Sequence, residues 1–220
     1  MEVKVLKNIL EVNKLLAQEN RQLFDKEKVF VVNLMSSPGA GKTSLVERTL
    51  ERLIEEDYRI AVIEGDIVGD FDAQRLAKFN IPIVQINTGS ECHLDANMIR
   101  NALSEIDLKG IDLLLIENVG NLVCPAEFKV GENVKVVILS TPEGDDKPHK
   151  YPLMFRESKV LLINKIDLLP QLEFAKEKVR KAIADLNPQM TIFEISCKTQ
   201  EGLENWIDWL KKQIEVCGNS

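Results

Sequence analysis

The chain has 220 residues, a net charge of −7 and 45% hydrophobic residues, which suits one domain with a core large enough to fold without disulfides. This composition excludes disordered and collagen-like chains, the acidic balance argues against a nucleic-acid partner, and no apolar run approaches the roughly 18 residues of a membrane span. Four scattered cysteines make no disulfide scaffold, so we expect a cytoplasmic protein with reduced thiols and no membrane partner.

Residues 3–24 are predicted to form an amphipathic helix ahead of the main domain. Positive and negative charges balance over this segment, which disfavours a basic membrane-surface helix. We interpret it as an element that packs on the domain, with a partner-binding helix as the alternative, and divide the chain into residues 1–26 and 27–220. The residues proposed to pack on the domain repeat with helical spacing, and they are Leu6, Ile9, Leu10, Asn13, Leu16, Ala17, Asn20, Leu23 and Phe24.

Short apolar runs then alternate with helical patterns along the rest of the chain. Several of these runs are apolar throughout, which is typical of strands buried on both faces of a parallel sheet. The alternation predicts an α/β fold with a doubly wound, mostly parallel sheet and helices on both faces. The expected strands are 29–35, 59–64, 81–86, 112–118, 134–140, 159–164 and 191–196, and the expected helices are 42–56, 71–79, 93–105, 171–186 and 201–215.

A glycine-rich loop follows the first expected strand and precedes a helix. The run Ser36–Thr43 matches the P-loop pattern, with Ser36 where the first glycine usually stands. Glycines allow backbone N–H groups to face phosphate oxygens, while Lys42 reaches the β- and γ-phosphates and Thr43 offers a hydroxyl to Mg²⁺. The pattern predicts a P-loop NTPase whose phosphate-binding residues are Ser37, Pro38, Gly39, Ala40, Gly41, Lys42, Thr43 and Ser44.

Acidic residues end two further strands and complete a predicted Mg²⁺ site. The second strand leads into Glu64-Gly65-Asp66 and the fourth into Glu117. Since Mg²⁺ usually takes only one or two carboxylates besides phosphates and water, we select Asp66 and Glu117 together with Thr43. Lys42, Thr43 and Asp66 are the predicted catalytic residues.

Two cysteines and a histidine follow strands at the same predicted edge of the sheet. Cys92 and His93 come after the third strand, and Cys124 comes after the Glu117 segment. Thiolate and imidazole suit Zn²⁺ or Ni²⁺, although these residues alone also fit a chance arrangement. Three ligands leave one position open, or two subunits pool their ligands. Cys197 and Cys217 are interpreted as structural thiols or bystanders.

The charged run 143–150 follows the fifth strand at the same edge. One interpretation is a solvated loop with an exposed His149. The other is that Lys147 or Lys150 reaches a partner subunit's nucleotide or the 66–72 region.

The sixth strand ends in Asn164-Lys165-Ile166-Asp167, which predicts guanine as the base. The Asp167 carboxylate accepts from the two adjacent donors of guanine, which adenine lacks. Asn164 is expected to hold neighbouring loops and Lys165 to cover the base, and the Ser196-Cys197-Lys198 loop is expected to close over the guanine oxygen. The nucleotides are therefore GTP and GDP.

Together these motifs resemble the hydrogenase nickel-incorporation GTPases of the HypB type, over residues 29–210. The resemblance implies a GTPase that dimerises with nucleotide and delivers nickel during maturation of nickel–iron hydrogenase. It implies partners among the other maturation proteins and the hydrogenase large-subunit precursor. It also implies that Cys92, His93 and Cys124 bind Zn²⁺ or Ni²⁺ at the subunit interface.

Two sequence features bear on the alternative functions. Asn121 stands where regulatory GTPases place a water-positioning glutamine, so we expect slow hydrolysis. Urease accessory GTPases use a Cys-Pro-His motif, whereas Cys124 and Pro125 are followed by Ala126, which makes urease maturation the runner-up. A scaffold in which GTP is only a structural ligand, or a GTPase that serves another metalloenzyme, also fits the residues.

Overall fold

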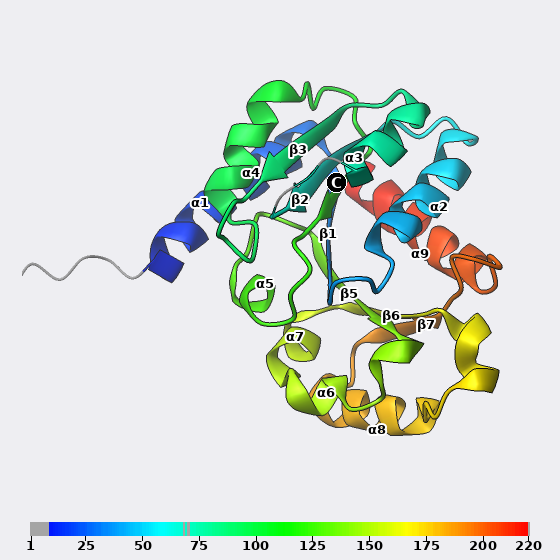
Figure 1. Cartoon of the computed structure of the whole chain (residues 1–220). Coiled ribbons are helices and arrows are strands. Elements are labelled where there is room, and N and C mark those ends of the chain that lie inside the picture. Colours follow the sequence, from blue (N-terminus) through cyan, green and yellow to red (C-terminus); the bar gives the residue numbers. More distant parts are fainter. Residues whose placement is uncertain (1–8, 68, 70, 220) are drawn as a thin grey trace, which may run out of the picture.

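Seven parallel strands form one sheet at the centre of the molecule (Figure 1). The computed structural model describes residues 9–67, 69 and 71–219, so residues 3–8 of the predicted first helix lie outside it. The strand order is β3-β2-β4-β1-β5-β6-β7, which confirms the predicted doubly wound fold. The strands are β1 (Phe30–Ser36), β2 (Ile60–Asp66), β3 (Ile83–Asn87), β4 (Leu113–Glu117), β5 (Val134–Ser140), β6 (Val160–Asn164) and β7 (Thr191–Glu194).

Helices cover both faces of this sheet (Figure 1). The α-helices are α1 (Ile9–Glu27), α2 (Lys42–Ile54), α3 (Phe71–Leu76), α4 (Ala96–Ala102), α5 (Cys124–Glu127), α6 (Lys147–Lys150), α7 (Pro152–Glu157), α8 (Lys176–Leu186) and α9 (Leu203–Gly218). Short 3-10 turns are η1 (Ala77–Phe79), η2 (Leu103–Glu105), η3 (Thr141–Glu143) and η4 (Ile166–Gln171).

Alternating side chains of the central strands separate two cores. Val32 and Leu34 of β1 face α2 and α9, whereas Val31 and Met35 face the helices of the opposite side. Trp206 of α9 is fully buried in the first core. All strands point the same way, and their carboxyl ends therefore meet at one edge, beside the switch point around β1.

Several predicted helix bounds are wrong for local reasons. The expected helix 93–105 begins only at Ala96, because the Asp95 side chain accepts the Met98 N–H and caps the helix there. The expected helix 171–186 begins at Lys176, after η4 has included residues 166–171. Helices α5, α6 and α7 were not predicted, since each has only four to six residues.

Helix α1 packs on the domain, mainly against α4, as its amphipathic pattern predicts. Its buried residues are Asn13, Ala17, Asn20 and Phe24. Part of the predicted stripe is wrong, because Ile9, Leu10 and Leu23 are exposed. The buried face of α1 is therefore narrower and more polar than the predicted packing stripe.

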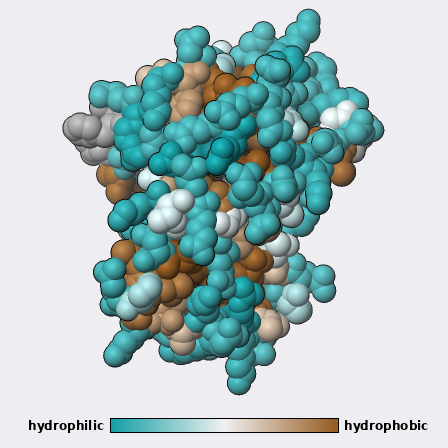
Figure 2. Space-filling model, turned by 90° about the vertical axis from the view of Figure 1, so that its right-hand side faces the viewer, coloured by the Kyte–Doolittle hydropathy of each residue, from teal (hydrophilic) through white to brown (hydrophobic). Residues whose placement is uncertain are grey.

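The surface over α2 and α9 is mostly hydrophilic, with apolar areas gathered in the lower part of the view in Figure 2. No helix in the described part of the chain combines the length and the apolar character needed to cross a membrane.

Candidate functional site

The P-loop links β1 to α2 at the carboxyl edge of the sheet. Gly39 and Gly41 have φ angles of 72° and 101°, which disfavour residues with a Cβ. A Cβ on Gly41 would also lie 2.5 Å from the Asn164 amide nitrogen. The Lys42 ammonium group donates to Ser36 Oγ at 3.2 Å, so the serine at the first glycine position contacts the P-loop lysine.

The Asn164 side chain joins the P-loop to the segments that carry Lys165 and Cys197. Its Nδ2 donates to the Ala40 carbonyl at 2.9 Å, and its Oδ1 accepts from the backbone N–H groups of Lys165 at 2.8 Å and Cys197 at 3.2 Å. The Lys165 ammonium group donates to the Gly39 carbonyl at 2.6 Å. The predicted loop-holding role of Asn164 therefore agrees with the geometry.

A cavity of about 400 Å³ opens beside these loops. Ser196 Oγ donates to Asp167 Oδ1 at 2.6 Å, which links the two predicted base-binding segments. The lining includes the predicted residues Gly41, Ser44, Asn164, Lys165, Asp167, Cys197 and Lys198, together with Glu47, Arg48, Arg75 and Leu168, which sequence reasoning missed.

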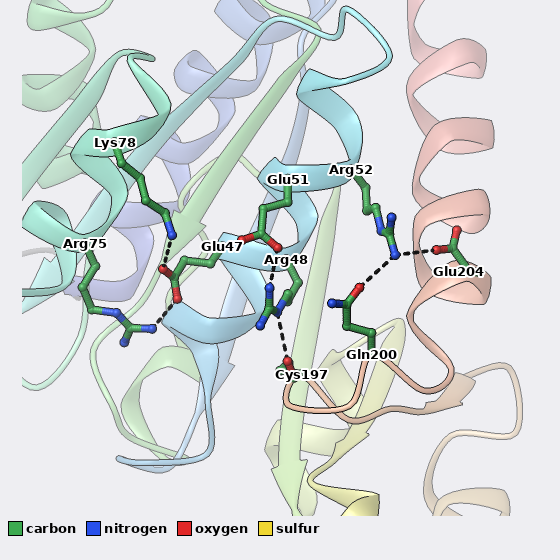
Figure 3. A network of polar contacts seen from close by, with 9 residues as sticks. All are labelled: Glu47, Arg48, Glu51, Arg52, Arg75, Lys78, Cys197, Gln200 and Glu204. Carbon is green, nitrogen blue, oxygen red and sulfur yellow. Dashed lines mark hydrogen bonds and ion pairs between the residues drawn. The ribbon is translucent and has the colours of Figure 1, made fainter.

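Helix α2 forms one wall of this cavity, and its side chains contact the segments on either side of the helix (Figure 3). Arg48 Nε donates to the Cys197 carbonyl at 3.0 Å, while Arg52 donates to the Gln200 side chain at 2.8 Å. On the other side, Glu47 pairs with Arg75 and with Lys78. Burial opposes ionisation of Glu47, but hydrogen bonds from Lys78 and Arg75 lower the pKa of its carboxyl group.

Three acidic side chains line a second cavity of about 290 Å³ next to the P-loop lysine. Asp66 and Glu117 are the predicted pair, and Thr43 Oγ1 donates to Glu117 Oε1 at 2.8 Å. Glu64 is the third acid and was not selected from the sequence. It pairs in register with Glu117 on the neighbouring strand, and both side chains are buried. Its position near the end of a strand, two residues before Asp66, was the sequence signal that could have identified Glu64 as part of the site.

Cys92, His93 and Cys124 lie together, with one ligand atom of each within 4.8 Å of the others. Cys92 Sγ donates to Cys124 Sγ at 3.0 Å, and Cys92 Sγ lies 4.0 Å from His93 Nδ1. The His93 imidazole packs on the Phe128 ring, with centroids 3.9 Å apart. Soft sulfur and imidazole donors at these distances fit Zn²⁺ or Ni²⁺.

Hydrogen bonding and burial shift the pKa values of two of the candidate ligands. The hydrogen bond with Cys92, followed by burial, raises the pKa of the Cys124 thiol above its ordinary value of 9.0. Burial lowers the pKa of His93 below 6.5, although the Asp95 and Glu91 carboxylates oppose this shift. The cluster therefore presents a neutral His93 imidazole and a protonated Cys124 thiol at neutral pH.

The segment from Glu117 to Cys124 belongs to both sites. Asn118 Oδ1 accepts from the Leu94 N–H at 3.0 Å, next to His93, and Asn121 Nδ2 donates to the Cys92 carbonyl at 3.2 Å. A Cβ on Gly120 would lie 3.0 Å from the P-loop residue Pro38. One short segment thus contacts the P-loop, its threonine and the thiol cluster.

The remaining predicted residues have local partners. Lys150 pairs with Asp146 at 2.6 Å, and the Lys147 ammonium group lies 5.6 Å from the centre of the Tyr151 ring. His149 is exposed, as expected. Burial raises the pKa of the Cys197 thiol to about 11, which fits a structural thiol within the base-side loop.

Residues 30–194 match the model of the CobW/HypB/UreG nucleotide-binding domain. The chain is 47% identical to the hydrogenase maturation factor HypB of Azotobacter vinelandii over 211 residues, covering 96% of this chain and 69% of that protein. It is 46% identical to HypB of Escherichia coli (strain K12), covering 97% and 72%. The crystal structure of HypB from Helicobacter pylori in complex with nickel gives a TM-score of 0.89 at 38% identity, covering 93% of this chain and 96% of that chain.

Proposed function

Because the chain belongs to the CobW/HypB/UreG family and within it to the HypB hydrogenase maturation factors, we propose that it is a GTP-hydrolysing switch that controls nickel binding. The proposal includes a GTP-dependent homodimer in the cytoplasm that delivers nickel, or holds zinc, during hydrogenase maturation. Its partners are the other maturation proteins and the hydrogenase large-subunit precursor. The urease runner-up has less support, because Cys124 and Pro125 are followed by Ala126 and not by the histidine of the urease accessory motif.

Guanine recognition is proposed for Asp167, with Lys165 and the Ser196–Lys198 loop around the base. An ionised Asp167 carboxylate accepts hydrogen bonds, and guanine offers the adjacent pair of donors that adenine lacks. Ser196 Oγ donates to Asp167, and this contact helps to orient the carboxylate of Asp167, which lines the cavity. The same contacts support GTP and GDP as ligands.

Hydrolysis transfers the γ-phosphoryl group of GTP to water. Backbone N–H groups of residues 37–44 would hold the phosphates, and Lys42 would stabilise the charge that develops between the β- and γ-phosphates. The oxygen donors Thr43, Asp66 and Glu117 suit Mg²⁺, which would neutralise phosphate charge when bound. Asn121, which stands where regulatory GTPases place a water-positioning glutamine, donates to the Cys92 carbonyl instead, and we expect a rate on the order of 10⁻⁴ per second.

The observation that carries the proposal is the segment shared by the two sites. Glu117 contacts Thr43 of the nucleotide site, and Asn121 and Asn118 hold the backbone on the two sides of His93, at the Cys92 carbonyl and the Leu94 N–H. A change of partners at Glu117 on nucleotide binding would therefore move the thiol cluster. Because coupling between two sites is reciprocal, metal would change GTP affinity by the same factor.

A Ni²⁺ titration of the purified chain, with GDP and with a non-hydrolysable GTP analogue, tests the proposal. We expect different nickel affinity in the two nucleotide states. Cys92→Ser and Cys124→Ser should remove metal binding and keep GDP binding, whereas Lys42→Ala should abolish GTP-dependent dimerisation and keep the metal site. Identical nickel binding in both states would support the scaffold instead, and no nickel binding would remove the metal role.

A further inference from the structure

Two of the four buried residues of α1 are asparagines, and the other two are Ala17 and Phe24. Asn13 is 7% exposed and Asn20 is 2% exposed. Buried amides require hydrogen-bond partners, and a leucine of similar size would fill the same space without them. The hydrogen-bond partners of Asn13 and Asn20 therefore show which segments these asparagines hold together.

Both amides bridge the same two segments of the chain. Asn13 Oδ1 accepts from the Ala96 N–H at 2.8 Å, and its Nδ2 donates to the Lys129 carbonyl at 2.8 Å. Asn20 Nδ2 donates to the Ala96 carbonyl at 2.9 Å and to the Val130 carbonyl at 3.1 Å. Helix α1 thus holds the first residue of α4 at a fixed distance from residues 129–130.

These two segments carry the halves of the thiol and imidazole cluster. Ala96 follows closely after Cys92 and His93, and Lys129 follows the Cys124–Phe128 stretch. Phe128, directly beside Lys129, packs on the His93 ring at 3.9 Å between centroids. The bridge that Asn13 makes therefore closes a ring of contacts through Phe128 and His93.

We propose that Asn13 and Asn20 are positioning residues of the metal site, and that α1 sets the separation of its two halves. This inference rests on the proposed metal-binding role of Cys92, His93 and Cys124. Metal ligands need their supporting groups to hold a fixed geometry. A shift of α1 along the domain would therefore change metal affinity, although α1 supplies no ligand.

The test measures metal affinity of the full chain in which Asn13→Leu and Asn20→Leu are combined. Zn²⁺ affinity is measured by competition with a chromophoric chelator, and Ni²⁺–thiolate absorption bands report the ligand geometry. We expect Zn²⁺ binding to weaken by about 10- to 100-fold and the Ni²⁺ bands to shift. GDP affinity should stay unchanged, since neither asparagine contacts the nucleotide site.

A gentler variant separates positioning from folding. Asn13→Asp keeps an acceptor for the Ala96 N–H but loses the donor to the Lys129 carbonyl, so it removes one end of the bridge. It should weaken Zn²⁺ binding while GDP binding shows that the chain is folded. If the double leucine variant does not fold, this variant decides the question.

Asn187→Leu is the matched control. The Asn187 amide donates to the carbonyls of Phe155, Arg156 and Ser158, which belong to neither of the two segments that α1 bridges, so its loss removes a similar set of side-chain-to-backbone hydrogen bonds and leaves the bridge intact. Zn²⁺ affinity in this control should equal that of the unaltered chain. Unaltered Zn²⁺ affinity in both the Asn13→Asp and the double leucine variants would overturn the inference. Absence of Zn²⁺ binding to the unaltered chain would instead overturn the proposed function.

Discussion

At the scale of single residues, Arg48 links α2 to the loop that borders the base cavity. It donates to the Cys197 carbonyl at 3.0 Å and lines the cavity beside Asp167 and Lys198. Arg48→Ala should free this loop and weaken GDP binding about tenfold, which is the effect of losing one charged hydrogen bond. The preference for GDP over ADP should fall with it, as measured by nucleotide competition.

Arg52→Ala is the internal control for this prediction. Arg52 lies one helical turn further along α2 and pairs with Gln200 and Glu204, but it does not line the cavity (Figure 3). GDP affinity should be unaltered in this variant. Equal losses for Arg48→Ala and Arg52→Ala would show that both arginines act only through the stability of the loop.

The pH dependence of metal binding follows from the two shifted ligands. The pKa of Cys124 lies above 9.0, so this thiol is protonated at neutral pH and must release its proton to the solvent when metal binds. Zn²⁺ affinity should therefore rise with pH through the whole neutral range. The pKa of His93 lies below 6.5, so its protonation adds to the slope only below that pH.

Competition titrations between pH 5.5 and 9 check this expectation. Cys124→Ser removes one of the protons that metal must displace, so any residual Zn²⁺ binding should depend less steeply on pH. An affinity that is constant between pH 7 and 9 would contradict a protonated Cys124 thiol in the metal-free cluster.

At the scale of elements, the end of β4 faces both sites. Glu117 and Asn118 are adjacent, so their side chains point to opposite faces of the sheet, Glu117 toward Thr43 and Asn118 toward the Leu94 N–H. Asn118→Ala should leave GDP and Zn²⁺ binding measurable but reduce the difference in Zn²⁺ affinity between GDP and GTP-analogue states. A typical coupling of about 1–3 kcal/mol gives a difference large enough to measure. An undiminished difference would place the coupling elsewhere.

The regular elements are predictable because they depend on long periodic patterns. All seven strands occur within two or three residues of their predicted bounds, since buried strands are apolar throughout. The start of α4 was predicted too early, because the Asp95 side chain caps the helix and so fixes its first residue at Ala96, although the helical pattern extends back to residues 93–94. The four-residue helix α5 has no period to detect, although it begins at Cys124.

The site was predictable where a motif fixes both the residue and its spacing. The P-loop, Asn164-Lys165-Ile166-Asp167 and the three metal-ligand candidates lie at one edge of the sheet, as parallel strands require. Glu64, Arg48 and Asn13 were missed, because their roles depend on contacts with distant segments. A helical pattern identified Asn13 as part of the packing face of α1 but carried no information about Lys129 or Ala96.

At the scale of the whole molecule, exposed apolar residues flank both sites. Ile67 beside the acidic cavity is 44% exposed, and Val123 beside Cys124 is 55% exposed. We expect a second copy to cover this edge in the GTP state. Ile67→Ser combined with Val123→Ser should prevent GTP-dependent dimerisation, as measured by light scattering, while each monomer still binds GTP.

Val216→Ser controls for the loss of exposed apolar surface. Val216 is 66% exposed and lies at the other end of the molecule, in the cavity that Phe30 lines at the start of β1. The dimer should persist in this variant. Loss of the dimer in the control, or its retention in the double variant, would contradict an interface at the ligand edge.

The two tryptophans give the chain its own optical reporter. Both belong to α9 and stack with ring centroids 5.5 Å apart, and Trp206 Nε1 donates to Thr49 Oγ1 of α2 at 3.1 Å. Helix α2 begins at the P-loop lysine, so motion of this helix on phosphate binding changes the surroundings of an indole. Helix α5, which begins at Cys124, packs on the opposite face of the sheet. We therefore expect native fluorescence to report nucleotide exchange without an attached dye, and to respond less to metal binding at the thiols.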